Sequence, residues 1–263
     1  MELERISCCS IPLHARPVDE ALAIIREAGF KKVDLLGRMP HFDINDPTYD
    51  FPGVVSRAEK LGLRIANIGS YCGGGFSSPD PAVQEEAIAE TRRVIDAAAL
   101  CGARSIRTRA GHPEDPAFLD RVVDCYRRVA EYAEAKGVYM GVENHGGAIS
   151  GNPELLAELF ERVGSRYAGV LYEPCNLALA GVDYRAALDT LRPYVVHVHL
   201  KDCYPVQGKM RTVWLGTGMI DFRWVIGELE RAGYDGDYAL EYELDVEPPE
   251  SALPKWLDWF LHV

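Results

Sequence analysis

The chain of 263 residues predicts a single α/β domain, residues 1–263, folded as a closed (β/α)8 barrel. Three observations lead to this prediction. A helical run, a glycine and a β-rich run follow one another repeatedly, the repeats are about 33 residues long, and no linker-like stretch separates them. Strands that alternate with helices form right-handed crossovers and a parallel sheet, and eight units favour a closed barrel over an open doubly wound sheet.

The strands are expected in order wherever a β-rich run begins. Most of them follow a glycine, because glycine adopts the left-handed conformation that closes the last turn of a helix. The expected strands cover residues 5–11, 32–36, 64–68, 105–108, 138–143, 169–173, 195–200 and 238–241.

The helices between these strands are marked by prolines and aspartates at their starts. Proline is tolerated in a first turn, and aspartate accepts hydrogen bonds from the free amides there. The third helix should bury one face, and the last helix is expected at residues 254–262. The expected first-turn prolines are Pro17, Pro116 and Pro153, and the expected capping aspartates are Asp80, Asp183 and Asp221. The expected buried face of the third helix consists of Val83, Ala87, Ile88, Val94, Ile95 and Ala98.

Composition excludes several classes of function. A hydrophobic fraction of 48% permits a large core, but no stretch approaches the roughly 20 apolar residues that cross a bilayer. A net charge of −12 disfavours nucleic acid as a partner. The seven cysteines form no Cys-x-x-Cys pair, and the first residues lack a basic and then apolar signal, so we expect a cytoplasmic protein with reduced thiols.

Four expected strands end on side chains that bind metals: Glu143, Glu173, His199 and Glu241. Active sites of such barrels lie at the C-terminal ends of the strands, and neighbouring strands are about 4.8 Å apart. The four side chains can therefore converge on one divalent ion. Three carboxylates favour Mn²⁺ or Mg²⁺, while Co²⁺ or Zn²⁺ would also fit. Each residue alone could simply face water, but four equivalent positions favour the metal site.

The residues around His199 support this hypothesis. His197 points to the same face of the strand and is expected to pack lower in the barrel. We expect Asp202 to orient His199 and Lys201 to hold a substrate oxygen, unless both belong to a solvated loop. Glu243 shares a face with Glu241 and is expected to support it.

Further candidates for substrate binding follow other strands. Arg109 is closer to its strand tip than Arg107, although an arginine there is as often an ion-pair partner. His112 and His145 lie just beyond strand tips, where they can contact hydroxyl groups. Residues 71–76 form a glycine-rich loop that could cover the substrate, but it lacks the glycine spacing and the lysine of a phosphate loop.

A family resemblance is carried by five motifs in a fixed order. They are Val-Glu-Asn-His at 142–145, Tyr-Glu-Pro-Cys-Asn at 172–176, His-Val-His-Leu-Lys-Asp at 197–202, Gly-Thr-Gly-Met-Ile-Asp at 216–221 and Gly-Tyr-Asp-Gly-Asp-Tyr-Ala-Leu-Glu at 233–241. The chain resembles the xylose isomerase-like TIM-barrel superfamily of sugar phosphate isomerases and epimerases.

The resemblance implies one divalent metal ion held by Glu143, His199 and Glu241, and it places Asn176 in the substrate site. Glu173 stands where the family usually has aspartate. Because glutamate is one methylene longer, it ligates the metal only if the metal or the backbone shifts, and otherwise it contacts the substrate.

The implied enzyme abstracts a proton beside the carbonyl of a sugar, polyol or hydroxy-keto acid through a metal-stabilised enediolate, with Glu143 and Glu241 as base and acid. The outcome is epimerisation or isomerisation. The same enediolate could expel a hydroxyl group, as in a dehydratase of an inosose- or dehydroshikimate-like compound. A non-catalytic sugar- or metal-binding barrel remains an alternative because of Glu173. The resemblance also suggests a homodimer or homotetramer.

The related apurinic endonucleases are disfavoured. They carry an additional histidine ligand where this chain has Asn176, and no Asp-x-His pair follows His199.

Overall fold

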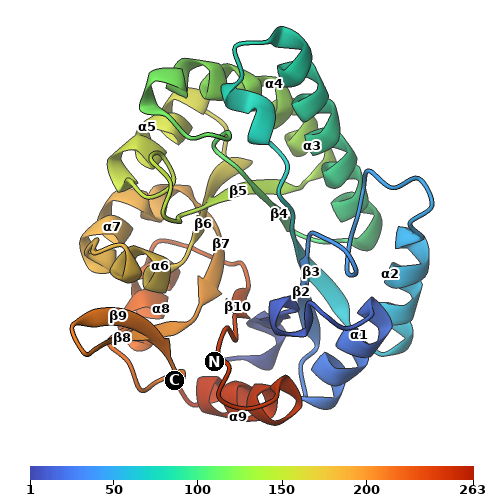
Figure 1. The fold of residues 1–263 in the computed structure, drawn as a ribbon, viewed down its shortest axis with the longest axis vertical. Coiled ribbons are helices and arrows are strands. Elements are labelled where there is room, and N and C mark those ends of the chain that lie inside the picture. Colours follow the sequence, from blue (N-terminus) through green and yellow to red (C-terminus); the bar gives the residue numbers. More distant parts are fainter.

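The computed structural model describes residues 1–263, and it is a closed barrel of parallel strands surrounded by helices (Figure 1). The barrel order is β1-β10-β7-β6-β5-β4-β3-β2, which confirms the predicted fold class. The barrel strands are β1 Ile6–Cys9, β2 Lys32–Leu36, β3 Arg64–Gly69, β4 Ser105–Thr108, β5 Tyr139–Glu143, β6 Ala168–Tyr172, β7 Val195–Leu200 and β10 Tyr238–Leu240.

The helices form the outer ring, and their buried faces pack on the strands. Asp80, Asp183 and Asp221 cap three of them as predicted, each accepting a hydrogen bond from a backbone amide of the first turn. The helices are α1 Val18–Glu27, α2 Phe51–Lys60, α3 Pro81–Cys101, α4 Leu119–Lys136, α5 Pro153–Val163, α6 Pro174–Leu179, α7 Tyr184–Leu191, α8 Phe222–Arg231 and α9 Pro249–Leu261.

Two expectations about element bounds and one about burial were wrong. The first strand is shorter than residues 5–11, because the chain turns into a short 3-10 helix at Ile11. The last helix starts at Pro249, and Pro254 lies inside it. One helical hydrogen bond is lost there, but the buried face of α9 outweighs that loss. Val83 is exposed, since the 21 residues of α3 extend beyond the four-residue strand β4.

A hairpin that the sequence analysis did not predict follows β7. Its strands β8 Asp202–Val206 and β9 Lys209–Val213 are antiparallel, and they project from the side of the barrel (Figure 1). The turn residues Gln207 and Gly208 both have positive φ, as two-residue hairpin turns require.

The two ends of the chain lie side by side, because the Met1 ammonium donates a hydrogen bond of 3.1 Å to the carbonyl of Leu261 (Figure 1). None of the helices combines the length and apolar character needed to cross a lipid bilayer.

Glycine in β6 allows close packing beneath the candidate site. A methyl group on Gly169 would collide with the carbonyl oxygen of Tyr194 and approach the side chain of Val196. Because one of these obstacles is backbone, the strand could relieve the clash only by moving.

Gly169→Ala should therefore lower the free energy of unfolding by about 1–3 kcal/mol, the usual cost of overpacking. Urea denaturation measures this effect. Gly146→Ala is the matched control, since no atom lies within 4 Å of its added methyl group. Equal stability of the two variants would contradict the packing argument.

Candidate functional site

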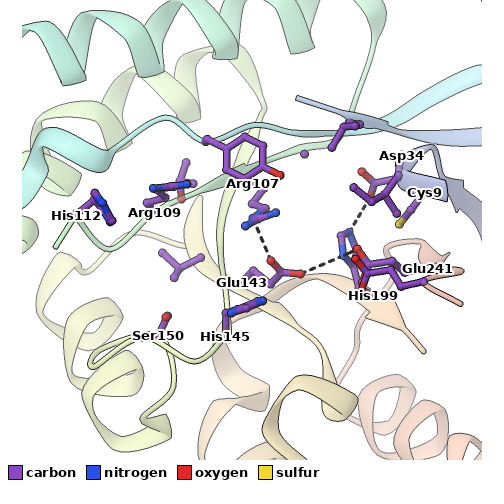
Figure 2. Close-up of a pocket in the computed structure, with 18 of the residues that line it drawn as sticks. Cys9, Asp34, Arg107, Arg109, His112, Glu143, His145, Ser150, His199 and Glu241 are labelled. Atoms are coloured by element: carbon purple, nitrogen blue, oxygen red, sulfur yellow. Dashed lines mark hydrogen bonds and ion pairs between the residues drawn. The ribbon is translucent and has the colours of Figure 1, made fainter. Parts of the chain in front are cut away.

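A cavity of about 460 Å³ opens at the C-terminal ends of the barrel strands. Figure 2 shows that Asp34, His199 and Glu241 lie at one end of it, and that Arg109, His112 and Ser150 lie at the other. The predicted site residues that line the cavity are Glu143, His199, Glu241, Lys201, Glu243, Arg109, His112 and His145.

Glu143, His199 and Glu241 form a group that could hold a metal ion, since their ligand atoms all lie within 4.8 Å of one another. His199 Nδ1 is 3.4 Å from Glu143 Oε1 and 3.8 Å from Glu241 Oε1. All three residues are buried, and His199 Nδ1 has no hydrogen-bond partner. A buried nitrogen without a partner between two carboxylates fits a divalent cation.

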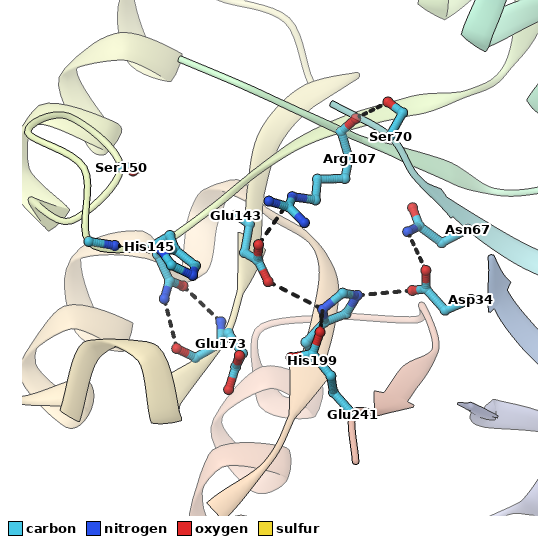
Figure 3. Close-up of polar contacts among 12 residues, drawn as sticks. Asp34, Asn67, Ser70, Arg107, Glu143, His145, Ser150, Glu173, His199 and Glu241 are labelled. Carbon is cyan, nitrogen blue, oxygen red and sulfur yellow. Dashed lines mark hydrogen bonds and ion pairs between the residues drawn. The ribbon is translucent and has the colours of Figure 1, made fainter. Parts of the chain in front are cut away.

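Asp34 of β2 lies behind His199 and fixes its ring (Figure 3). Asp34 Oδ2 is 3.0 Å from His199 Nε2 and 2.7 Å from His197 Nε2, while Asn67 donates to Oδ1. Burial opposes ionisation of Asp34, but His199 and His197 hold its pKa well below the usual range. Because Nε2 is occupied by Asp34, Nδ1 is the nitrogen left for a cation.

The charge of His199 follows from the same neighbours. Burial opposes a charged ring, but the ionised carboxylate of Asp34 raises the pKa of His199 above its ordinary value. Nδ1 faces two carboxylates, and a metal ion bound there would replace any proton that the nitrogen carries.

A second group of metal-binding side chains consists of Cys9, Asp34 and His199. Both oxygens of Asp34 already accept hydrogen bonds, and burial raises the pKa of the Cys9 thiol well above its ordinary value. This second group is therefore a poorer cation site than the group around His199 Nδ1.

The role expected for Asp202 belongs to Asp34, and the prediction for Asp202 was wrong. The carboxylate of Asp202 accepts hydrogen bonds from backbone amides at the base of the hairpin and in the loop that follows it. The donors are the backbone amides of Cys203, Gly216, Gly218 and Ile220. Asp202 thus shapes the wall of the barrel mouth without reaching His199.

Glu173 and Lys201 form a buried ion pair at the position expected for a fourth ligand. Lys201 Nζ lies 2.8 Å from Glu173 Oε2, 2.6 Å from Glu241 Oε2 and 2.7 Å from Glu243 Oε2. Burial opposes its charge, but these carboxylates raise the pKa of Lys201, so it stays protonated. Glu173 is completely buried and lies outside the three-residue group.

The backbone of Glu173 is held by Asn144, whose side-chain amide donates to the Glu173 carbonyl and accepts from the Glu173 amide. Burial raises the pKa of the Glu173 carboxyl well above its ordinary value, although Lys201 acts in the opposite direction.

Arg107, ranked below Arg109 in the sequence analysis, contacts the three-residue group directly. Its Nε lies 3.1 Å from Glu143 Oε2 (Figure 3). Burial opposes ionisation of Glu143, but Arg107 and His199 lower its pKa well below the usual range. Arg107 lies inside an expected strand between Ile106 and Thr108, and the free-energy cost of burying an unpaired charge there was the signal that it needs a partner.

The remaining predicted residues differ in position. His112 and His145 are exposed at the cavity wall, and His197 lies buried below His199 as expected. Asn176 does not line the cavity, because it lies in the first turn of α6, which leads the chain away from β6. Asp34 and Asn144 were missed by the sequence analysis.

Comparisons with known proteins show the family of the chain. The family described as xylose isomerase-like TIM barrel matches residues 22–262. L-ribulose 3-epimerase from Mesorhizobium japonicum is 27% identical over 236 residues, covering 85% of this chain and 75% of the relative. Inosose dehydratase from Geobacillus thermodenitrificans is 28% identical over 141 residues, which span 48% of this chain and only 47% of the dehydratase.

Among solved structures, a xylose isomerase-like TIM-barrel protein from Mycobacterium smegmatis, in complex with magnesium, superimposes with a TM-score of 0.82. Its sequence is 18% identical, and the match covers 100% of this chain and 97% of that protein, so it supports the fold.

Removing the cation of the Glu173–Lys201 pair should destabilise the chain. Lys201→Met removes the counter-charge that Glu173 shares with Glu241 and Glu243, so Glu173 must stay ionised in a buried site or take up a proton, and the loss of one partner of a buried pair typically costs about 3–5 kcal/mol. Urea denaturation of metal-free protein measures the loss. Glu173→Gln in the same background should recover part of it, since the uncompensated carboxylate is then gone. If the double variant is no more stable than Lys201→Met, the two residues are not coupled.

Proposed function

We propose that this chain, which belongs to the xylose isomerase-like TIM-barrel family, is a divalent-metal-dependent epimerase or isomerase of a small carbohydrate-like compound. The observation that carries the proposal is the buried group of Glu143, His199 and Glu241. Its unpartnered nitrogen, His199 Nδ1, faces two carboxylates at one end of the cavity at the barrel mouth.

Glu143, His199 and Glu241 would hold the ion, and Mn²⁺ or Mg²⁺ suits this oxygen-rich set. Such an ion polarises a carbonyl and stabilises the negative charge that develops on its oxygen. Glu173 would act as a fourth ligand only if its carboxylate left Lys201 and bound the metal ion instead. Lys201 pairs with the carboxylate of Glu173, and Asp34 holds the ring of His199.

The chain supplies the proton transfers. Glu143 and Glu241 flank His199 from two sides: Glu241 follows β10, the direct neighbour of β7, and Glu143 ends β5, which lies on the other side of β7 beyond β6. Arg107 keeps Glu143 ionised and Lys201 pairs with Glu241, so a carboxylate oxygen on either side can accept a proton from carbon. Return of a proton to the opposite face gives the epimer, and return to the neighbouring carbon gives the isomer.

A dehydratase is the second candidate function. The match with inosose dehydratase favours it, and so does the ammonium of Lys201, which lines the cavity beside Glu241. After proton removal from carbon, a hydroxyl on the next carbon would leave as water with a proton from Lys201 or a protonated carboxyl group.

Proton exchange with solvent tests the proposal. Incubated in D₂O with Mn²⁺ and a panel of ketoses, inososes and hydroxypyruvate, the protein should place deuterium beside the carbonyl of its substrate, seen by NMR. Glu143→Gln and Glu241→Gln should each slow the exchange by about 10²–10⁴-fold, since each removes a proton acceptor. Glu134→Gln, on the exposed surface of α4, is the control.

Unchanged exchange in both site variants would show that the acid and base are assigned wrongly. Loss of water from the substrate, seen by mass spectrometry, would identify the dehydratase. Mn²⁺ binding without exchange or water loss on any compound would instead indicate a non-catalytic binding barrel.

The Asp34–His199 contact gives a prediction for metal affinity. Asp34→Asn should weaken Mn²⁺ binding by about 10–100-fold, because the ring of His199 loses its charged anchor. Isothermal titration calorimetry measures the affinity. Asp124→Asn makes the same chemical change at an exposed position of α4 and should have no effect. Equal affinities of the two variants would show that Asp34 does not support the metal site.

A further inference from the structure

We propose that the end of the cavity remote from His199 is a carboxylate-binding subsite centred on Arg109. The substrate would then be a hydroxy-keto carboxylate whose acid group lies away from the reacting carbonyl. This inference rests on the proposed function for its reacting end, but the subsite itself follows from separate residues.

Arg109 has no counter-ion. It lines the cavity and is half-buried, yet its guanidinium makes no ion pair and no hydrogen bond within the chain, where 40 acidic residues outnumber 28 basic ones. Arg107, two residues earlier on the same face, is paired with Glu143. An unpaired cation facing a cavity is suited to an anionic group of the ligand.

The guanidinium is nevertheless held in place. Its central carbon lies 5.1 Å from the ring centroid of Tyr71, and that of Arg107 lies 4.7 Å from the same ring. Contact with an aromatic ring fixes the plane of a guanidinium and leaves its edge free for two parallel hydrogen bonds. A planar carboxylate matches that edge.

The acidic residue at this end of the cavity has other partners. Glu114 accepts hydrogen bonds of 2.9 Å from the Ile149 amide, 2.7 Å from the Ser150 amide and 2.8 Å from Ser150 Oγ. It therefore anchors the loop that carries His145, without neutralising Arg109. Its negative charge opposes a phosphate dianion more than a carboxylate, which is why we assign the subsite to a carboxylate.

The spacing suits a short carbon chain. Two residues along a strand advance by about 6–7 Å, which is the offset between the backbone positions of Arg107 and Arg109. In Figure 2, His112 lies at the same end as Arg109 and His145 lies close to Glu143, so both can contact polar groups along a bound chain.

Binding of unreactive probes tests the subsite. D-gluconate, D-sorbitol and D-sorbitol 6-phosphate share a six-carbon polyol chain and differ in charge. Calorimetry on metal-free and Mn²⁺-loaded protein should show D-gluconate as the tightest of the three. Arg109→Gln should weaken the affinity for D-gluconate by about 10–100-fold, which is what hydrogen bonds to a charged group contribute, and leave the affinity for D-sorbitol unchanged. Arg109→Lys should weaken D-gluconate binding by an intermediate factor, because lysine keeps the positive charge but lacks the two parallel N–H groups of the guanidinium.

Arg211→Gln is the matched control, since Arg211 is exposed on β9 and makes no ion pair. The proposal is overturned if Arg109→Gln behaves like this control, or if it weakens D-sorbitol as much as D-gluconate. Tighter binding of D-sorbitol 6-phosphate would reject the carboxylate in favour of phosphate.

Failure of the proposed function gives a different result. In that case Mn²⁺ would not bind near His199, while D-gluconate would still depend on Arg109 in the metal-free protein. Conversely, Mn²⁺ binding and proton exchange without any effect of Arg109→Gln on D-gluconate would overturn the subsite alone.

Discussion

Charges buried at the mouth of the barrel have to be neutralised by one another, because an ion without a partner in a protein interior costs several kcal/mol. Asp34 is shared by His197 and His199, Glu143 is paired with Arg107, and Lys201 contacts several carboxylates. After these pairings, His199 Nδ1 still has no partner. The candidate metal position is therefore where the pairing of charges is incomplete.

Closure of the barrel makes these pairings possible. Asp34 and His199 are 165 residues apart in sequence and face each other across the barrel interior. The strand ends could be predicted from the sequence, because the helix–glycine–strand repeat marks each one, and this located Glu143, His199 and Glu241. Asp34 could not be assigned in this way, since it lies in the middle of its strand instead of at the end, and its partners lie far along the chain.

Nearness in sequence was misleading for Asp202. It follows His199 by three residues, but the chain leaves the barrel there and enters the hairpin, so its carboxylate faces the loop amides. The longer side chain of Glu173 posed a related problem. The sequence shows that a glutamate replaces the usual aspartate, but only the structure shows that Lys201 reaches it. Lysine and glutamate then act as one unit, since either alone would be a buried charge.

The different surroundings of Arg107 and Arg109 follow from where β4 ends. Arg107 pairs with Gly141 and Thr108 with Val142, and the strand stops there, so Arg109 is the first residue past the paired segment. The carboxylate of Glu143, at the end of β5, contacts Arg107. On the other side, the Arg109 amide donates to the Cys72 carbonyl, and the central carbon of the guanidinium lies 5.1 Å from the ring centroid of Tyr71. Arg109 thus has an aromatic neighbour but no carboxylate partner. The backbone that builds the ion pair at one end of the cavity therefore leaves a fixed, unpaired guanidinium at the other end.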